Sequence, residues 1–340
     1  MLSRKLPYHA VGLLGMIGGI ITYLHNGRIS DLAWQRLLRA HVRSNGRFTE
    51  WLRPMLAIFR PKDERREVSG LLGSFSVAQQ DEIAQVLRRD GFYKFEALMP
   101  AEICDELQRF AEVTPALPSG DPNDLRKLIY DPESPVGPVY KILEPDAILC
   151  PAMQRLISDQ AFVAIAEAYI GAGTSIGGID LWWSARYGNA PSSDAAQLFH
   201  FDFDAPPIWL KLFVYLTDIG PDDGPHVFVK GSHRPGIRAA AGLRARGYER
   251  ISDGDIEEAF GKDAVLTVTG SRGTVFFADT RAFHKGTLPT AHHRLIAQLI
   301  YCVSIFNNHI FPAKIPVNPI PELRNAVLER PRAYERFNRG

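Results

Sequence analysis

The sequence His200-Phe201-Asp202 places two metal-ligating side chains at alternate positions. Residues two apart in an extended strand point to the same face, so the imidazole and the carboxylate can converge on one ion. His284 supplies a third ligand from the stretch DTRAFHKG, 279–286, which follows an apolar run and ends at a glycine. Two histidines and one carboxylate form the facial triad of non-haem Fe(II) oxygenases, which leaves coordination positions open for a co-substrate and dioxygen.

Arg294 follows His284 by ten residues and opens the apolar run 295–303. Its rigid guanidinium can hold a carboxylate through two parallel hydrogen bonds. A guanidinium buried in such a strand without a partner is costly, which favours a functional role over a surface position. Gln298 lies four residues further along the strand, on the same face, so we expect Arg294 and Gln298 to line one wall of the site.

Other residues compete for the metal-ligand positions. Asp204 is the next residue on the face of His200, but four residues of strand place it roughly 13 Å away. His292 and His293 are alternatives to His284. Adjacent side chains in a strand face opposite ways, and both histidines precede Arg294 directly, so we expect them in an exposed loop.

The order of these motifs resembles that of a known family. After HxD come GPHVFVKGSH, 224–233, and then H-x9-R, and the stretch VLRRDGF, 86–92, precedes them. This arrangement resembles the phytanoyl-CoA dioxygenase family of Fe(II)/2-oxoglutarate enzymes, over roughly residues 75–312. We expect His226 and His233 to hold the turn of the GSH segment and not to bind metal.

The resemblance implies a mainly β protein with helical additions, built on a double-stranded β-helix, which is a variant of the jelly roll. It implies that His200, Asp202 and His284 bind iron and that Arg294 binds the C5 carboxylate of 2-oxoglutarate. Dioxygen is the second co-substrate. The family often has a hydroxyl two residues after the distal histidine; this chain has glycine there and Thr287 one residue later, so Thr287 is the candidate contact to the co-substrate.

The implied reaction is hydroxylation of an unactivated C–H bond in a small organic, lipid or secondary-metabolite substrate, with release of succinate and CO2. Halogenases of this fold need a small residue where this chain has Asp202, so the carboxylate argues against halogenation. Desaturation, ring closure and epimerisation use the same ligands and stay open. The alternative is a non-catalytic jelly-roll binding module with a vestigial metal site, against which the intact set of ligands argues.

Composition limits the partners and the compartment. The net charge of +1 gives no general attraction to nucleic acid, and the apolar and charged fractions, 46% and 23%, are ordinary for a globular protein. The three cysteines are scattered and lack CxxC spacing, which indicates neither a disulfide framework nor a zinc ribbon. We therefore expect a cytoplasmic protein.

Residues 1–66 differ from the rest of the chain. They contain twelve Lys and Arg against four Asp and Glu, a local charge of +8. An apolar run at 10–24 is followed by two segments, 31–42 and 50–59, with apolar residues at helical spacing between arginines. Two interpretations stay open: an anchor that holds the enzyme at the inner face of a membrane, or a helical annex packed on the catalytic domain.

The remaining boundaries follow from composition. Residues 67–74 are expected to form a linker, 75–312 the dioxygenase domain, and 313–340 a proline-rich, basic C-terminal tail. We expect helices at 76–89, 100–113 and 151–170, with Ser76 as an N-cap. Strands are expected at 175–186, 208–217, 274–278 and 295–303.

Overall fold

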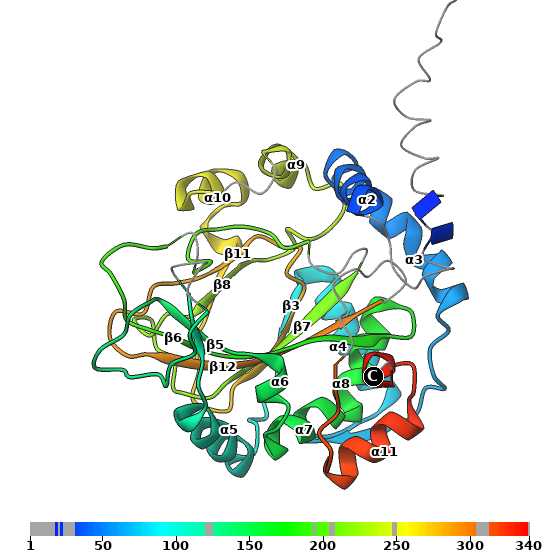
Figure 1. The fold of residues 1–340 in the computed structure, drawn as a ribbon. Helices are drawn as coiled ribbons and strands as arrows, with labels where there is room; N and C mark the ends of the chain where they lie inside the picture. The colour runs from blue at the N-terminus through cyan, green and yellow to red at the C-terminus, as the bar shows by residue number, and fades with distance from the viewer. Residues whose placement is uncertain are drawn as a thin grey trace, which may run out of the picture.

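The computed structural model describes residues 18, 19, 21, 22, 31–119, 125–192, 195–203, 208–246, 250–303 and 313–338. Two antiparallel sheets form the centre of the molecule, and helices lie on several sides of them (Figure 1). The larger sheet has the order β3-β10-β7-β12-β6-β5-β4 and the smaller sheet the order β11-β8-β9.

The strands of the larger sheet are β3 (Phe92–Lys94), β4 (Leu117–Pro118), β5 (Val139–Ile142), β6 (Ser175–Ser184), β7 (Trp209–Tyr215), β10 (Val275–Ala278) and β12 (Arg294–Cys302). Those of the smaller sheet are β8 (His226–Val229), β9 (Val265–Val268) and β11 (His284–Gly286), and β1 (Val68–Gly70) and β2 (Gly73–Phe75) form a separate hairpin.

The α-helices are α2 (Asp31–Arg43), α3 (Arg47–Phe59), α4 (Val77–Asp90), α5 (Ala101–Val113), α6 (Glu144–Ala147), α7 (Pro151–Ser158), α8 (Gln160–Ile170), α9 (Arg238–Ala245), α10 (Asp253–Phe260) and α11 (Pro321–Glu329). Two short 3-10 helices are η1 (Lys262–Ala264) and η3 (Glu335–Asn338). This helical content makes the fold mixed α/β with antiparallel sheets, which corrects the expectation of a mainly β chain with helical additions.

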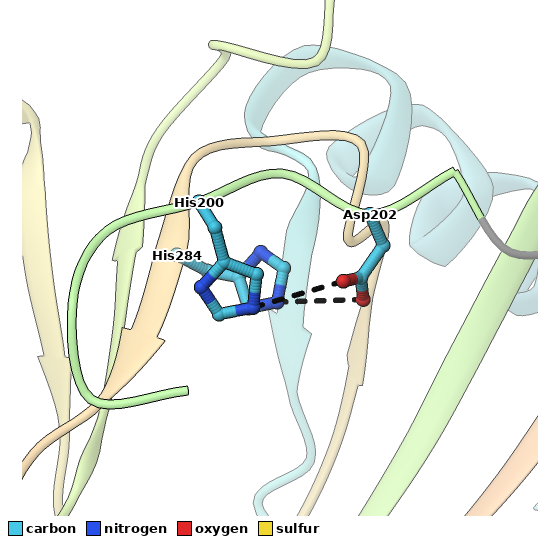
Figure 2. Close-up of side chains that lie close together, drawn as sticks. All are labelled: His200, Asp202 and His284. Atoms are coloured by element: carbon cyan, nitrogen blue, oxygen red, sulfur yellow. Dashed lines mark ion pairs between the residues drawn. The ribbon is translucent and has the colours of Figure 1, made fainter. Parts of the chain in front are cut away.

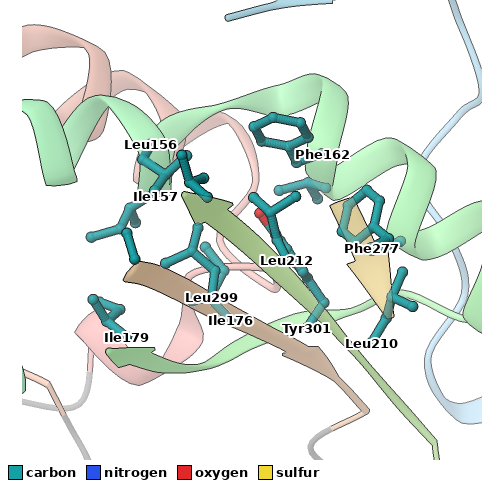
Figure 3. Packing of buried hydrophobic residues seen from close by; sticks show 14 of the residues in the cluster. Leu156, Ile157, Phe162, Ile176, Ile179, Leu210, Leu212, Phe277, Leu299 and Tyr301 are labelled. Carbon is teal, nitrogen blue, oxygen red and sulfur yellow. The ribbon is translucent and has the colours of Figure 1, made fainter. Parts of the chain in front are cut away.

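The alternation of β7 decides which side chains meet the helices and which face the second sheet. Leu210, Leu212 and Val214 are buried in the main core against α8 and its neighbours, where Figure 3 shows Leu212 near Phe162. Phe213 and Tyr215 point the other way, into an aromatic cluster that includes residues of β8 and β9 from the smaller sheet. The two sheets therefore pack face to face, as the period-two pattern predicts.

Local signals correctly placed α4. Ser76 accepts a hydrogen bond from the Gln79 backbone while the Gln79 side chain accepts from Ser76, which satisfies two otherwise unpaired amides. Gly91 ends the helix at φ 77°, a conformation that favours glycine, and the space beside it is filled by the ring of His233.

Two boundaries differ from the sequence expectation. The helix expected over 151–170 is two helices, because Asp159 turns the chain and caps α8 by accepting hydrogen bonds from the amides of Ala161 and Phe162. Residues 67–74, expected as a linker, form the β1–β2 hairpin, and the Leu71 amide donates to Asp159 at 2.5 Å. The buried Asp159 carboxylate thus stabilises both the start of α8 and the turn of the β1–β2 hairpin.

The described part of the N-terminal segment packs on the domain. Ala33 and Leu37 of α2 and Leu52 and Leu56 of α3 belong to the main hydrophobic core. Most of the apolar run at 10–24 lies outside the described residues. Within the part of the chain that the structure describes, no helix has both the length and the apolar character needed to cross a membrane.

We predict that Leu299→Ala destabilises the protein by roughly 2 to 5 kcal/mol, because the Leu299 side chain is fully buried where β12 meets the helices. Urea denaturation followed by circular dichroism measures the change. The matched control is Leu328→Ala on α11, whose side chain is 74% exposed, and it should stay within about 0.5 kcal/mol of the parent. Equal losses in the two variants would contradict the assigned core.

Candidate functional site

His200, Asp202 and His284 come together in one cluster (Figure 2). One ligand atom from each residue lies within 4.8 Å of the others. The His200 Nε2 to Asp202 Oδ1 distance is 3.7 Å, and the His284 Nε2 to Asp202 Oδ2 distance is 3.5 Å. Nitrogen and oxygen atoms at such separations can converge on a single cation, so the donor set fits a divalent metal.

The two histidines are held with Nε2 facing the cluster. In each, Nδ1 lies 2.9 Å from the backbone oxygen two residues earlier, Leu198 O for His200 and Ala282 O for His284. A carbonyl only accepts, so Nδ1 carries the proton and Nε2 presents a lone pair. Burial and, to a smaller extent, the neighbouring His284 together lower the pKa of His200 to about 3, which keeps the ring neutral as a metal requires.

Backbone pairing brings the ligands together. His200 and His284 exchange two hydrogen bonds across an antiparallel bridge, at 3.0 and 2.8 Å. The Asp202 amide donates to the carbonyl of Thr280 at 2.8 Å. The HxD segment therefore runs beside the chain that leads into β11, and the alternation of that ladder turns all three side chains to one side.

Lys211 of β7 is a further charged member of the cluster. Its Nζ lies 2.7 Å from Asp202 Oδ2, and its side chain is only 9% exposed. Burial alone would raise the pKa of Asp202, but the Lys211 ammonium and His284 hold that pKa well below its usual value. The carboxylate is thus anionic. Its Oδ2 is paired with Lys211, and its Oδ1 faces His200.

A buried ion pair fixes the chain just before His284. The Arg281 guanidinium holds both oxygens of Asp279, and the Tyr169 hydroxyl of α8 donates to the same carboxylate. Burial alone would raise the pKa of Asp279, but Arg281 holds it well below its usual value. Glu50 of α3 also accepts from Arg281, at 3.3 Å. The N-terminal helices thus take part in positioning the site.

Arg294 is buried between the sheets without an acidic partner. Its guanidinium donates to the Gly224 carbonyl and, at 3.1 Å, to the Ser184 hydroxyl, while its Nε has no partner. Within the described residues, no carboxylate lies within ion-pair distance of it. Burial lowers its pKa to about 10, so the group still carries its charge at neutral pH. A buried guanidinium of this kind can bind an anion through two parallel hydrogen bonds.

The glycine after the distal histidine leaves room for that guanidinium. A Cβ at Gly286 would lie 3.3 Å from Arg294 Nη2. Thr287 does not join them: its hydroxyl donates to the Pro225 carbonyl at 3.0 Å, and its side chain lines a cavity with Lys285, outside the smaller sheet. The structure therefore does not bring Thr287 to the face that carries His284.

Gln298 shares the sheet face of Arg294, as expected, but has a different set of partners. Its amide donates to Asp180 of β6 at 2.7 Å, and Lys141 of β5 pairs with the other oxygen of that carboxylate. Four strand residues separate Gln298 from Arg294, roughly 13 Å. The two residues line one wall, yet only Arg294 is left without an acidic partner.

The alternative ligands lie elsewhere. His292 is exposed and contacts Asp223, whereas His293 is half-buried against Trp183. His226 stacks within the aromatic cluster between the sheets, where burial and then Arg294 lower its pKa well below the usual value. Asp204 lies outside the described residues.

Sequence reasoning missed the roles of Lys211, Asp279 and Arg281. Lys211 alternates with Leu210 and Leu212 in the expected strand 208–217, but this position does not indicate that Asp202 is its partner. Asp279 and Arg281 were visible as charges next to an apolar run. Their pairing depends on Tyr169, far away in the chain, which no local pattern reveals.

Comparison with known proteins identifies the family. The family model for phytanoyl-CoA dioxygenase matches residues 87–291. The chain belongs to the phytanoyl-CoA dioxygenase family. It is thus an Fe(II)/2-oxoglutarate-dependent dioxygenase by family, with iron and 2-oxoglutarate as cofactor and co-substrate.

Individual relatives are more distant. Ectoine dioxygenase of Bordetella parapertussis is 26% identical over 275 residues, which cover 74% of this chain and 83% of the relative. Among solved structures, HygX of Streptomyces hygroscopicus, with nickel and 2-oxoglutarate bound, is 16% identical, covers 72% of this chain and 93% of its own, and has a TM-score of 0.49. The epimerase SnoN from nogalamycin biosynthesis is 18% identical, with coverages of 66% and 83% and a TM-score of 0.47.

We predict that Arg281→Ala lowers the free energy of unfolding by roughly 3 to 5 kcal/mol, because Asp279 would be left buried without its counter-charge. Thermal and urea denaturation measure the loss. The control is Arg272→Ala, which removes the exposed Arg272–Asp105 pair and should cost no more than about 1 kcal/mol. If Arg281→Ala is no more costly than the control, Asp279 does not depend on Arg281.

Proposed function

We propose that this protein hydroxylates an unactivated C–H bond of a small organic, lipid or secondary-metabolite substrate and converts 2-oxoglutarate to succinate and CO2. His200, Asp202 and His284 are the proposed iron ligands. The observation that carries this proposal is their convergence on one point, with both imidazole Nε2 atoms and an anionic carboxylate facing it. Iron bound there supplies the oxidising chemistry when 2-oxoglutarate and dioxygen are present.

In this proposal Arg294 binds the C5 carboxylate of 2-oxoglutarate. Gly224 O and Ser184 Oγ hold the guanidinium in place, so its orientation is set before the co-substrate arrives. Because Arg294 is buried, an ion pair formed with it gains strength from the low local dielectric. The aromatic cluster around Phe213 and Phe276 forms an apolar surface between the two sheets.

The same wall offers polar contacts for a substrate. Lys141, Asp180 and Gln298 form a connected polar group on the face of the larger sheet that carries Arg294. Lys141 is half exposed and Gln298 buried, so the group runs from solvent toward the interior. We propose that the substrate enters along it, and that the two facing sheets form the double-stranded β-helix implied by the motifs.

We predict that Asp202→Ala weakens binding of Mn(II), a stand-in for Fe(II), by more than about 100-fold, because it removes the anionic ligand. Anaerobic isothermal titration calorimetry measures the affinity, and succinate release should fall with it. The matched control is Asp253→Ala, which removes an exposed carboxylate that also pairs with a lysine, Lys285. Unchanged metal affinity in Asp202→Ala would exclude it as a ligand. Metal binding by the parent protein without any succinate from candidate substrates would favour the binding-module alternative.

We predict that Arg294→Ala weakens the binding free energy of 2-oxoglutarate by roughly 2 to 5 kcal/mol. The affinity for Mn(II) should stay near the parent value. Arg294→Lys should recover only part of the loss, because an ammonium cannot form the two parallel bonds. Titration of the metal-loaded protein with 2-oxoglutarate gives both values. Arg186→Ala, an exposed arginine just beyond β6, serves as control. Equal co-substrate affinity in Arg294→Ala and the control would place the carboxylate site elsewhere.

A further inference from the structure

Helix α3 is apolar on its outer face as well as its inner one. Leu52 and Leu56 are buried in the core, but Trp51, Ile58 and Phe59 on the other side are 66%, 77% and 61% exposed. Met55, 39% exposed, completes a stripe at positions i, i+4, i+7 and i+8, which is one face of a helix. Single exposed apolar residues are ordinary, whereas four in one stripe mark a surface that binds something.

Helix α3 and the neighbouring α2 carry exposed arginines. Arg47 at the start of α3 and Arg39 and Arg43 of the adjacent α2 are exposed, and among the described residues no carboxylate pairs with them. The acidic residue of α3, Glu50, turns away from the stripe and pairs with Arg53 and Arg281. The combination of exposed large apolar side chains with arginines and no facing carboxylate suits an anionic, partly apolar surface.

We propose that the outer face of α3 docks on an anionic lipid bilayer, with Trp51, Met55, Ile58 and Phe59 entering the boundary of the acyl chains and the nearby arginines meeting the headgroups. This is the composition of an interfacial helix. The sequence before these helices has a similar composition, because the apolar run at 10–24 follows the basic residues Arg4 and Lys5.

A lipid surface fits the stripe better than a second protein does. A stable protein interface engages about 20 to 30 residues on each side, whereas the stripe offers four apolar side chains on a helix of 13 residues. A bilayer needs only a few inserted side chains when basic residues add electrostatic attraction. The inner face of α3 is fixed in the core, so docking would hold the whole domain in one orientation.

The test is co-sedimentation of the full-length protein with vesicles. We expect binding to vesicles of phosphatidylcholine with phosphatidylglycerol, little binding to phosphatidylcholine alone, and release as the salt concentration rises. The double variant Trp51→Ser with Ile58→Ser should bind at least about tenfold more weakly. The control, Val113→Ser with Leu328→Ser, removes two equally exposed apolar side chains from α5 and α11 and should bind like the parent.

A second measurement uses only the conservative variant Trp51→Phe, which keeps an aromatic side chain at this position. Trp51 is exposed whereas Trp183 and Trp209 are buried, so brominated lipids should quench a fraction of the fluorescence that is absent in Trp51→Phe. Full binding by the double variant, or no quenching of Trp51, would overturn the proposal and leave residues 1–30 as the lipid contact. The proposal would also be overturned if the parent protein did not bind vesicles but formed dimers, and the double variant were monomeric. That result would identify a second copy of the chain as the partner of this face.

Discussion

The backbone bridge between His200 and His284 is the contact on which the site depends. Two segments far apart in sequence exchange a pair of hydrogen bonds, and side-chain alternation then sets His200, Asp202 and His284 on one side. A shift of one residue in this bridge would turn the side chains to the other face. The Asp279–Arg281 pair and the Tyr169 hydroxyl hold the chain that forms one side of the bridge, so the register rests on a charged network as well as on the ladder.

The sequence was informative where the determinants are local. The i, i+2 spacing of HxD, the position of Arg294 at the start of an apolar strand and the N-cap at Ser76 all depend on neighbours in the chain, and the structure has each in the expected place. The sequence also predicted that Arg294 would not be a surface residue, because it opens an apolar strand. The structure has it buried, with its Nε unpartnered, which is the costly arrangement expected of a binding residue.

The rest depended on contacts between distant segments. Gln298 was placed on the correct face, but its partner Asp180 belongs to β6, and pairing of β6 with β12 sets that contact. Thr287 is separated from His284 by an odd number of positions, so the ladder turns it outward, a consequence that a motif comparison overlooks. Asp159 divides the helix expected over 151–170, and its carboxylate also accepts a hydrogen bond from the Leu71 amide. Leu71 belongs to a hairpin that the sequence analysis expected to be a linker.

If the site binds as proposed, its charges favour joint binding of the metal and the co-substrate. Histidines bind a metal in their neutral form, so the fixed charges around the site are those of the Asp202 carboxylate, the Lys211 ammonium and the buried Arg294 guanidinium, which sum to an excess of positive charge. A divalent cation alone would increase that excess in a low dielectric. 2-Oxoglutarate carries two negative charges, so in the proposed binding mode it offsets the charge of the metal and supplies the anion that pairs with Arg294. Each ligand favours the other through this balance, and by linkage the gain in affinity is the same in both directions.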